Sequence, residues 1–288
     1  MSAVATAPAT EAAPGPAGRP RRRRRRWSRF VLPAYSWLII AYLVFPIAVM
    51  ILYSFNRVTT GLPQVSFAWN GFTTQWYQQW SNVSGLTSAF WLTIRLGIAS
   101  TVLATVLGTL LALALVRYRP PRFRGKNLVE QVLFLNIAAP EIVLGASLLG
   151  LFVTITLARG FLTLLLAHVM FSIAYVAITV RARMAGFDRS LEEAAQDLGA
   201  NAWVTFRKIT LPLIMPGVLA GALMAFALSI DDFVTSNFVS GSAVPFPVWV
   251  YGATRIGIPP QVFVFGTAIF SVGILCAIAS IVVGRRKA

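Results

Sequence analysis

Six stretches of this 288-residue chain are long and apolar enough to cross a lipid bilayer, and they constrain the fold more than any other feature. A membrane-spanning helix needs about 20 predominantly apolar residues. The stretches cover residues 31–55, 87–116, 128–150, 162–182, 217–239 and 261–283. Because 57% of the chain is hydrophobic and only 12% is charged, too little polar surface remains for a water-soluble domain. The sequence predicts an all-α membrane protein with six transmembrane helices.

The basic residues are distributed unevenly among the loops, and this predicts the orientation. Cytoplasmic loops carry an excess of Lys and Arg. Most of the 25 basic residues precede the first stretch, follow the last, or lie between the second and third or the fourth and fifth. The opposite side has Arg57, Arg159 and Arg255, with Arg95 near that end of the second stretch. Both termini are therefore expected in the cytoplasm.

The formal net charge of +16 does not indicate a nucleic-acid-binding protein. Basic residues that flank apolar helices anchor the chain and attract anionic membrane lipid. Residues 1–29 form an Arg-rich segment that is expected to be disordered. Residues 30–284 then form the transmembrane domain and 285–288 a cytoplasmic tail. The single cysteine and the single histidine exclude a disulfide scaffold and leave little material for a metal centre.

The loop after the first stretch is rich in aromatic residues, and two interpretations fit it. The residues are Phe67, Trp69, Phe72, Trp76, Tyr77 and Trp80. Aromatic side chains favour the lipid headgroup region, so they can anchor the chain there. The alternative is a docking surface for an extracytoplasmic partner.

A short amphipathic helix is expected between the fourth and fifth stretches, on the predicted cytoplasmic side. Ser190 and Glu193 have the spacing of a capping box, in which each side chain accepts a hydrogen bond from the other residue's N–H group. Gly199 suits the left-handed conformation that ends a helix. One face carries Leu191, Ala194, Ala195 and Leu198. Because two alanines keep this face shallow, another surface can approach the backbone closely.

A second amphipathic stretch follows, formed by Trp203, Phe206 and Ile209. Proline interrupts helices and is favoured in their first turn. Leu211-Pro212 is therefore expected to end the stretch, and Pro216 to begin the next membrane helix. On these grounds alone, the region could equally be a helical hairpin packed on its own protein.

The spacing of residues in this region resembles the EAA loop of permeases from binding-protein-dependent ABC importers. The matching residues are Glu193, Ala194, Ala195, Gly199, Ile209, Leu211 and Pro212. In that family the loop forms a coupling helix, within about 188–212 here, that sits in a cleft of the ATP-hydrolysing subunit. The resemblance implies the type I permease fold and a coupling role for these residues. The chain has no Gly-x-x-x-x-Gly-Lys-Ser/Thr motif, so ATP and magnesium are expected on a partner, with no cofactor or enzyme activity here.

Three carboxylates inside the predicted membrane helices are candidates for a solute pathway, because charge within a bilayer is costly. Glu141 lies in the third stretch, and Asp231 and Asp232 lie in the fifth. At 1.5 Å per residue, all three lie about 20 Å from the cytoplasmic start of their helices and share one layer. Their charge favours a cationic solute. Alternatively, an aspartate pairs with Arg95 or Arg255, or one carboxyl is protonated.

Other polar and aromatic residues belong to this hypothesis. Of the two aspartates, Asp232 is expected to contribute more to uptake than Asp231. The rings of Trp249 and Tyr251 could provide cation–π faces for an amine, although anchoring at the membrane interface explains them equally well. His168 is expected to be a hydrogen-bonded interior residue rather than a ligand.

A narrower resemblance extends over residues 30–283. The segments Pro140-Glu141-Ile-Val, Ser229-Ile-Asp231-Asp232-Phe233 and Pro245-Phe-Pro-Val-Trp249-Val-Tyr251-Gly look like those of spermidine/putrescine importer permeases. This implies an inner-membrane complex with a second homologous permease, an ATPase dimer and an external substrate-binding protein. Import of another organic solute or of ferric ion remains an alternative. An autonomous proton-coupled carrier is a further one, but it would have no use for an ATPase-docking loop.

Overall fold

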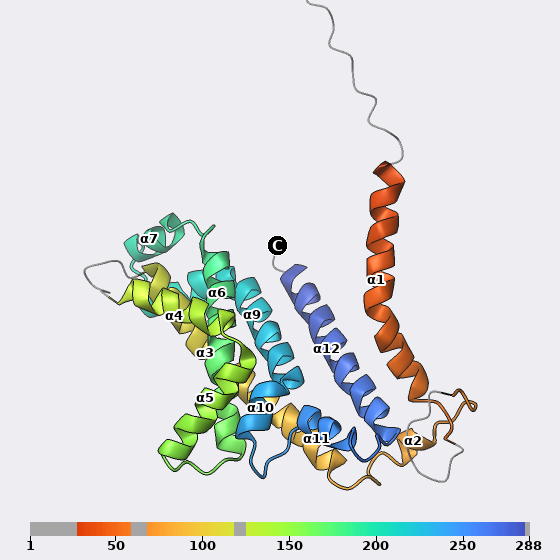
Figure 1. Ribbon diagram of the computed structural model, residues 1–288. Helices are drawn as coiled ribbons and strands as arrows, with labels where there is room; N and C mark the ends of the chain where they lie inside the picture. The colour runs from red at the N-terminus through yellow and green to blue at the C-terminus, as the bar shows by residue number, and fades with distance from the viewer. Residues whose placement is uncertain (1–27, 59–67, 118–124, 286–288) are drawn as a thin grey trace, which may run out of the picture. The chain divides into compact units, whose positions relative to one another are not determined.

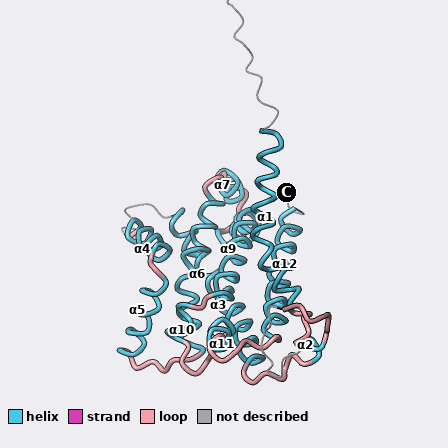
Figure 2. The backbone as a smooth tube through the Cα atoms, turned by 45° about the vertical axis from the view of Figure 1, so that its right-hand side comes forward, coloured by secondary structure: helices cyan, strands magenta, loops and turns pink. Residues whose placement is uncertain are grey.

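The computed structural model describes residues 28–58, 68–117 and 125–285. The predicted leader up to residue 27, Phe67, the loop at 118–124 and the last three residues lie outside this part. The described chain is helical, with one isolated antiparallel bridge between Asn56 and Phe72 (Figure 2). The elements are α1 Ser28–Tyr53, α2 Gln75–Gln78, α3 Leu86–Arg117, α4 Lys126–Ala138, α5 Glu141–Thr154, α6 Phe161–Met184, α7 Ser190–Asp197, α8 Ala202–Thr205, the π-helical turn η1 Phe206–Thr210, α9 Leu211–Asp231, α10 Val234–Val239, α11 Phe246–Ala253 and α12 Gln261–Arg285.

The chain divides into two units, one up to Ala48 and one from Val49 onward, and α1 crosses the boundary. The described part of the first unit is a single apolar helix whose large side chains are exposed, including Trp37, Leu38 and Tyr42. All sites described below belong to the second unit.

Helices α3, α6 and α9 pack together and form the centre of the second unit (Figure 1). Val176 of α6 lies where the three helices approach most closely. A Cβ atom on Gly108 of α3 would lie 2.7 Å from the Cβ atom of Val176, and one on Gly221 of α9 would lie 3.3 Å from its Cα atom. Small residues at such crossings let helix backbones come close in a membrane protein. The glycines therefore permit this packing.

Four described helical segments are long and apolar enough to cross a membrane, and a fifth span is possible if α4 and α5 count as one broken span. The four are Val31–Tyr53, Leu86–Arg117, Phe161–Met184 and Ala202–Asp231. The sixth predicted stretch is also helical, as α12. Its apolar portion Gln261–Leu275 is shorter than the four segments that are long enough to cross a membrane. The chain is thus a multi-pass helical protein.

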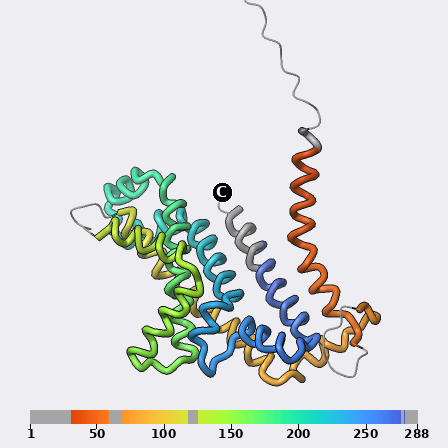
Figure 3. Tube along the Cα trace, viewed as in Figure 1, coloured from red at the N-terminus to blue at the C-terminus, as the bar shows by residue number. Residues whose placement is uncertain are grey.

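The third predicted stretch is not one helix. The chain leaves the helical conformation at Ala139 and Pro140, and α4 and α5 are bent by 111° (Figure 3). Proline disfavours the helical conformation of the residue before it and lacks an N–H group. The prediction that Glu141 lies within a continuous helix is therefore wrong, because Glu141 is the first residue of α5.

The fifth stretch also differs from the prediction, at both ends. Helix α9 ends at Asp231, Asp232 is extended, and α10 begins at Val234. At the other end, α8, η1 and α9 follow one another without a break, so Leu211-Pro212 does not end a helix and Pro216 lies inside one. Pro212 is the second residue of α9 and lies two positions after the π turn η1, inside this continuous helical segment. The π turn directly before it changes the hydrogen-bond register of the helix.

The aromatic residues near α2 pack against each other and against neighbouring helices. Trp76 is 7% exposed, and its indole N–H donates to the carbonyl of Asn56 at 2.8 Å. Phe72 stacks on Phe55, and Trp80 contacts Phe265 of α12. The rings of Phe72 and Trp80 are nevertheless exposed, so membrane anchoring and partner docking both remain predictions.

Candidate functional site

The predicted cytoplasmic helix is present as α7, but its first turn is not held by the predicted capping box. Ser190 is already helical, and the Glu193 N–H donates to the carbonyl of Arg189 rather than to the Ser190 hydroxyl. The Ser190 N–H instead donates to the Asp188 carboxylate at 3.0 Å. Hydrogen bonds from the backbone and side chain of Ser190 lower the pKa of this carboxyl below its ordinary value. The prediction of a capping box was wrong, because the carboxylate of Asp188 rather than that of Glu193 accepts the hydrogen bond from the Ser190 N–H group.

The apolar face of α7 and the turn after it project into solvent. No residue of α7 is buried. Leu198 is 90% exposed, Leu191 is 49% exposed, and Trp203 at the start of α8 is 66% exposed. Gly199 has the predicted left-handed conformation, with a φ of +87°, and a Cβ atom there would meet nothing within 4 Å. This apolar surface is therefore exposed and accessible to a partner, and its docking role stays a prediction.

The other EAA-type residues fall into two groups. Glu193 is exposed and lines a cavity of about 310 Å³, Ala194 is exposed and Ala195 is half-buried. Ile209 lies in η1, Leu211 packs against the core of α3, α6 and α9, and Pro212 is exposed. Glu193 and Ala194 are therefore accessible, whereas Leu211 is packed against the helix bundle.

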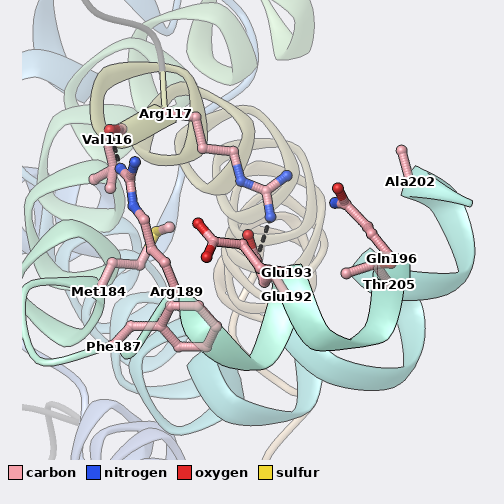
Figure 4. Close-up of a pocket in the computed structure, with 10 residues that line it drawn as sticks. All are labelled: Val116, Arg117, Met184, Phe187, Arg189, Glu192, Glu193, Gln196, Ala202 and Thr205. Carbon is pink, nitrogen blue, oxygen red and sulfur yellow. Dashed lines mark hydrogen bonds and ion pairs between the residues drawn. The ribbon is translucent and has the colours of Figure 1, made fainter. Parts of the chain in front are cut away.

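One polar cluster links α7 to α3 and to η1, and Figure 4 shows the part of it between Arg117 and Glu192. Arg117, the last residue of α3, donates to the carboxylate of Glu192 at 2.5 Å and to the hydroxyl of Thr210 at 3.1 Å. Thr210, the last residue of η1, also donates to Glu192. Nearby, Arg189 donates to the carbonyl of Val116 at 2.8 Å. Sequence analysis did not single out Glu192, because spacing alone could not distinguish it from the adjacent Glu193.

The three membrane acids line one cavity of about 390 Å³. Its walls come from α4, α5, α6, α9 and α10, and it lies where both broken helices are interrupted. It is lined by Asn136, Ile137, Ala139, Glu141, Leu144, Phe171, Tyr175, Leu228, Asp231, Asp232, Phe233, Val234 and Thr235. The structure thus brings Glu141, Asp231 and Asp232 together, although by helix breaks rather than by equal depth along unbroken helices.

Asp232 is engaged by its own protein. Its side chain is 7% exposed, and its carboxylate accepts hydrogen bonds from the N–H groups of Thr235 at 3.3 Å and Ser236 at 2.7 Å, in the first turn of α10. It also lies 3.5 Å from the ring of His168. The other hydrogen bonds of His168 go to the hydroxyls of Ser229 at 2.7 Å and Ser236 at 3.0 Å. The expectation that His168 is a hydrogen-bonded interior residue is confirmed.

Asp231 is in a different electrostatic position. It is the last residue of α9 and is exposed. The C-terminus of a helix carries partial negative charge, which disfavours an anion there, whereas Glu141 and Asp232 lie at the favourable N-terminal ends of α5 and α10. Among the described residues, no ion pair includes Asp231 or Glu141, so pairing of Asp231 with Arg95 or Arg255 is not observed.

The two predicted cation–π residues do not line the acidic cavity. Trp249 lines a separate cavity of about 620 Å³ together with Arg95. The ring of Tyr251 packs at a tilt against that of Phe233, with 4.7 Å between the ring centroids, and Arg255 already lies over the Tyr251 ring at 5.2 Å. The aromatic residues that do line the cavity are Phe171, Tyr175 and Phe233. The helical spacing of Phe171 and Tyr175 after His168 is the signal that could have identified two of them.

A family model described as "Binding-protein-dependent transport system inner membrane component" matches residues 104–286. The spermidine/putrescine transport system permease protein PotC of Escherichia coli (strain K12) is 38% identical over 260 residues, which are 90% of this chain and 96% of that protein. The putrescine transport system permease protein PotI of the same strain is 38% identical over 254 residues, or 85% of this chain and 88% of that protein.

Solved structures agree with these relatives at the level of fold. A chain of a bacterial ABC transporter involved in the import of the acidic polysaccharide alginate has a TM-score of 0.64 and 19% identity, covering 91% of this chain and 97% of its own. A chain of the MetNI methionine ABC transporter has a TM-score of 0.57 and 17% identity, covering 74% and 98%. The fold is that of ABC importer permeases, and the chain belongs to the family of inner-membrane components of binding-protein-dependent transport systems.

Proposed function

We propose that this chain is a permease subunit of an ATP-driven importer for polyamines of the putrescine and spermidine class. Half of the translocation path would be formed by this chain, and the acidic cavity would be part of that path. The observation that carries the proposal is Asp231, an exposed carboxylate at the C-terminal end of α9 that shares its cavity with Glu141 and with aromatic rings. The relatives named for spermidine and putrescine support the same solute class.

The electrostatics of the cavity favour an organic cation. The C-terminal ends of α4 and α9 and the N-terminal ends of α5 and α10 meet at the cavity, so their opposite partial charges offset one another and the carboxylates supply its negative charge. Interrupted helices whose ends face a midplane site are a recurring way for transporters to bind ions and charged substrates. The rings of Phe171, Tyr175 and Phe233 would contact the methylene chain or face an ammonium group.

The partners and the orientation complete the proposal. The exposed face of α7, with Glu193, Ala194, Ala195 and Gly199, would dock on an ATPase dimer that binds the ATP and magnesium. Ile209, Leu211 and Pro212 would connect this face to α9. A second, homologous permease and an extracytoplasmic substrate-binding protein would complete the complex. Six spans in the bacterial inner membrane, with both termini in the cytoplasm, are consistent with the distribution of basic residues.

The test is uptake of labelled putrescine and spermidine by cells that lack the gene, with and without a plasmid copy. Restored uptake that unlabelled polyamine abolishes is the expected result. Ferric ion or another organic solute competing better than polyamine would favour the alternative cargo. Uptake that persists when the ATPase gene is deleted would favour an autonomous carrier.

The docking role needs its own test. Leu198→Asp would place a charge on the most exposed apolar side chain of the α7 face and should abolish co-purification of the ATPase subunit. Leu166→Asn, an exposed apolar position on α6, is the control for a general effect of lost apolar surface. Unchanged co-purification of the Leu198 variant would contradict the proposed docking face.

A further inference from the structure

Helix α7 has little of its own to hold it in place. It has eight residues and buries none of them. An isolated helix of this length is marginal in water, and most helix stability in proteins comes from packing of an apolar face. Its attachment to the bundle therefore depends strongly on polar contacts, and the Glu192 carboxylate makes two of them.

These contacts bring three elements to one point. The Glu192 side chain is 16% exposed and pairs with Arg117 at the end of α3. Thr210 is fully buried, lies at the end of η1 and bonds to both of the charged residues. Helix α9 begins at the next residue and continues without a break to Asp231. At 1.5 Å per residue, this helix spans about 30 Å.

We propose that Glu192 is a positioning residue that fixes the coupling helix α7 to the end of α3 and to the base of α9, so that movement of α7 is transmitted to the acidic cavity. This inference rests on the proposed function, in which α7 is driven by an ATPase. Glu192 and Glu193 then have separate tasks, because both line the same cavity but only Glu192 bonds to Arg117 and Thr210, while Glu193 is exposed and free to contact the partner.

The π-helical turn fits this arrangement. Its final residue, Thr210, is the one whose hydroxyl bonds to Glu192 and Arg117. A single π turn in an α-helical segment shifts the side-chain register by inserting a residue and is frequent at functional sites. Here the shifted segment leads directly into the helix that ends at the cavity, so a rigid connection at Thr210 couples rotation of α7 to α9.

The test uses the complete transporter, with its ATPase, second permease and binding protein, reconstituted in proteoliposomes. ATP hydrolysis and labelled polyamine uptake are measured in the same vesicles for Glu192→Gln. Uptake per ATP hydrolysed should fall about fivefold or more, the lower end of typical coupling effects, while the ATPase stays bound. Equal losses of hydrolysis and uptake, or an unchanged ratio, would overturn the proposal.

Two further variants separate positioning from general damage. The exchanged pair Arg117→Glu with Glu192→Arg restores the opposite charges and should recover part of the ratio. Glu130→Gln is the matched control, because Glu130 forms a similar partly exposed ion pair with Arg181 at 3.1 Å that does not involve α7. A lowered ratio in the control, or no recovery in the exchanged pair, would argue against a specific role.

A second measurement does not depend on the solute and so remains valid if the polyamine assignment fails. Spin labels at Asp197→Cys and Leu213→Cys, two exposed positions, report the distance between α7 and α9 in the purified complex, with Cys276 replaced by alanine. Glu192→Gln should broaden this distance distribution and Glu130→Gln should not. Identical distributions would overturn the positioning role.

Discussion

The ring of His168 and the carboxylate of Asp232 lie 3.5 Å apart, with the His168 side chain 1% exposed and that of Asp232 7% exposed. This contact gives the two adjacent aspartates different surroundings. Asp232 is turned inward, where it also holds the first turn of α10, while Asp231 is exposed at the end of α9. The expectation that Asp232 contributes more to uptake than Asp231 is therefore revised, and we now expect the opposite order.

Replacing each aspartate by alanine tests this division. Asp231→Ala should lower polyamine uptake about tenfold or more, because an interaction with a charged group contributes about 1.5–3 kcal/mol, and it should leave thermal stability unchanged. Asp232→Ala should instead lower the free energy of unfolding by about 1–2 kcal/mol, the usual cost of losing a helix cap. Uptake in intact vesicles and melting in detergent measure the two effects. Wild-type uptake by the Asp231 variant would contradict the cavity assignment.

His168→Leu should destabilise the protein by about 1–3 kcal/mol, because it removes one buried hydrogen-bond partner from each of the hydroxyls of Ser229 and Ser236, together with the polar contact to Asp232. Thermal unfolding in detergent is the measurement. Ser172→Ala, one turn along α6, is the matched control: Ser172 is fully buried and its hydroxyl has no hydrogen-bond partner in the described residues. Equal melting temperatures for the two variants would show that the His168 contacts contribute nothing specific.

Gly199→Val should uncouple ATP hydrolysis from uptake or weaken association with the ATPase. The φ of +87° is strained for a β-branched residue, although the site itself is open. Gly199→Asn should retain more coupling, since asparagine tolerates this conformation. Gly186→Val is a suitable control, because Gly186 is also uncrowded but has no positive φ. Coupled transport at the wild-type level in the Gly199→Val variant would count against the docking role.

Gly108→Ala should destabilise the bundle by about 1–3 kcal/mol, the typical cost of overpacking, because the added Cβ atom would meet Val176 at 2.7 Å. A second substitution, Val176→Gly, should recover part of the loss, because it removes the Cβ atom that the new alanine would meet. Gly150→Ala in α5 meets nothing within 4 Å and should be neutral or mildly stabilising. Melting temperatures of the four proteins check this, and the absence of any recovery would mean that the close approach is not the cause.

The apolar stretches predicted the helices well, because burial in a membrane leaves a signal in composition over about 20 residues. The interruptions at Pro140 and Asp232 were missed for different reasons. Pro140 is visible in the sequence, but membrane helices tolerate proline when neighbours satisfy the freed backbone groups, so its presence alone does not require a break. Asp232 caps α10 through N–H groups only three and four residues away, but its contact with His168 depends on tertiary packing.

The candidate site shows the same division between local and distant information. The left-handed Gly199 and the exposed α7 face follow from a short segment and were predicted correctly. The different contacts of Glu192 and Glu193, and of Asp231 and Asp232, could not be predicted. They depend on Arg117 and on His168, which are far away in the sequence. The displacement of Trp249 from the cavity likewise depends on how α11 packs.

Val176 fits between Gly108 and Gly221 too closely for α3, α6 and α9 to slide past one another. If these three helices move as one rigid body, the hinges must lie where the chain leaves the helical conformation. Two such places, at Ala139-Pro140 and at Asp232, border the cavity that contains Asp231. A hinge there would reshape the solute's surroundings without disturbing the bundle that carries the force.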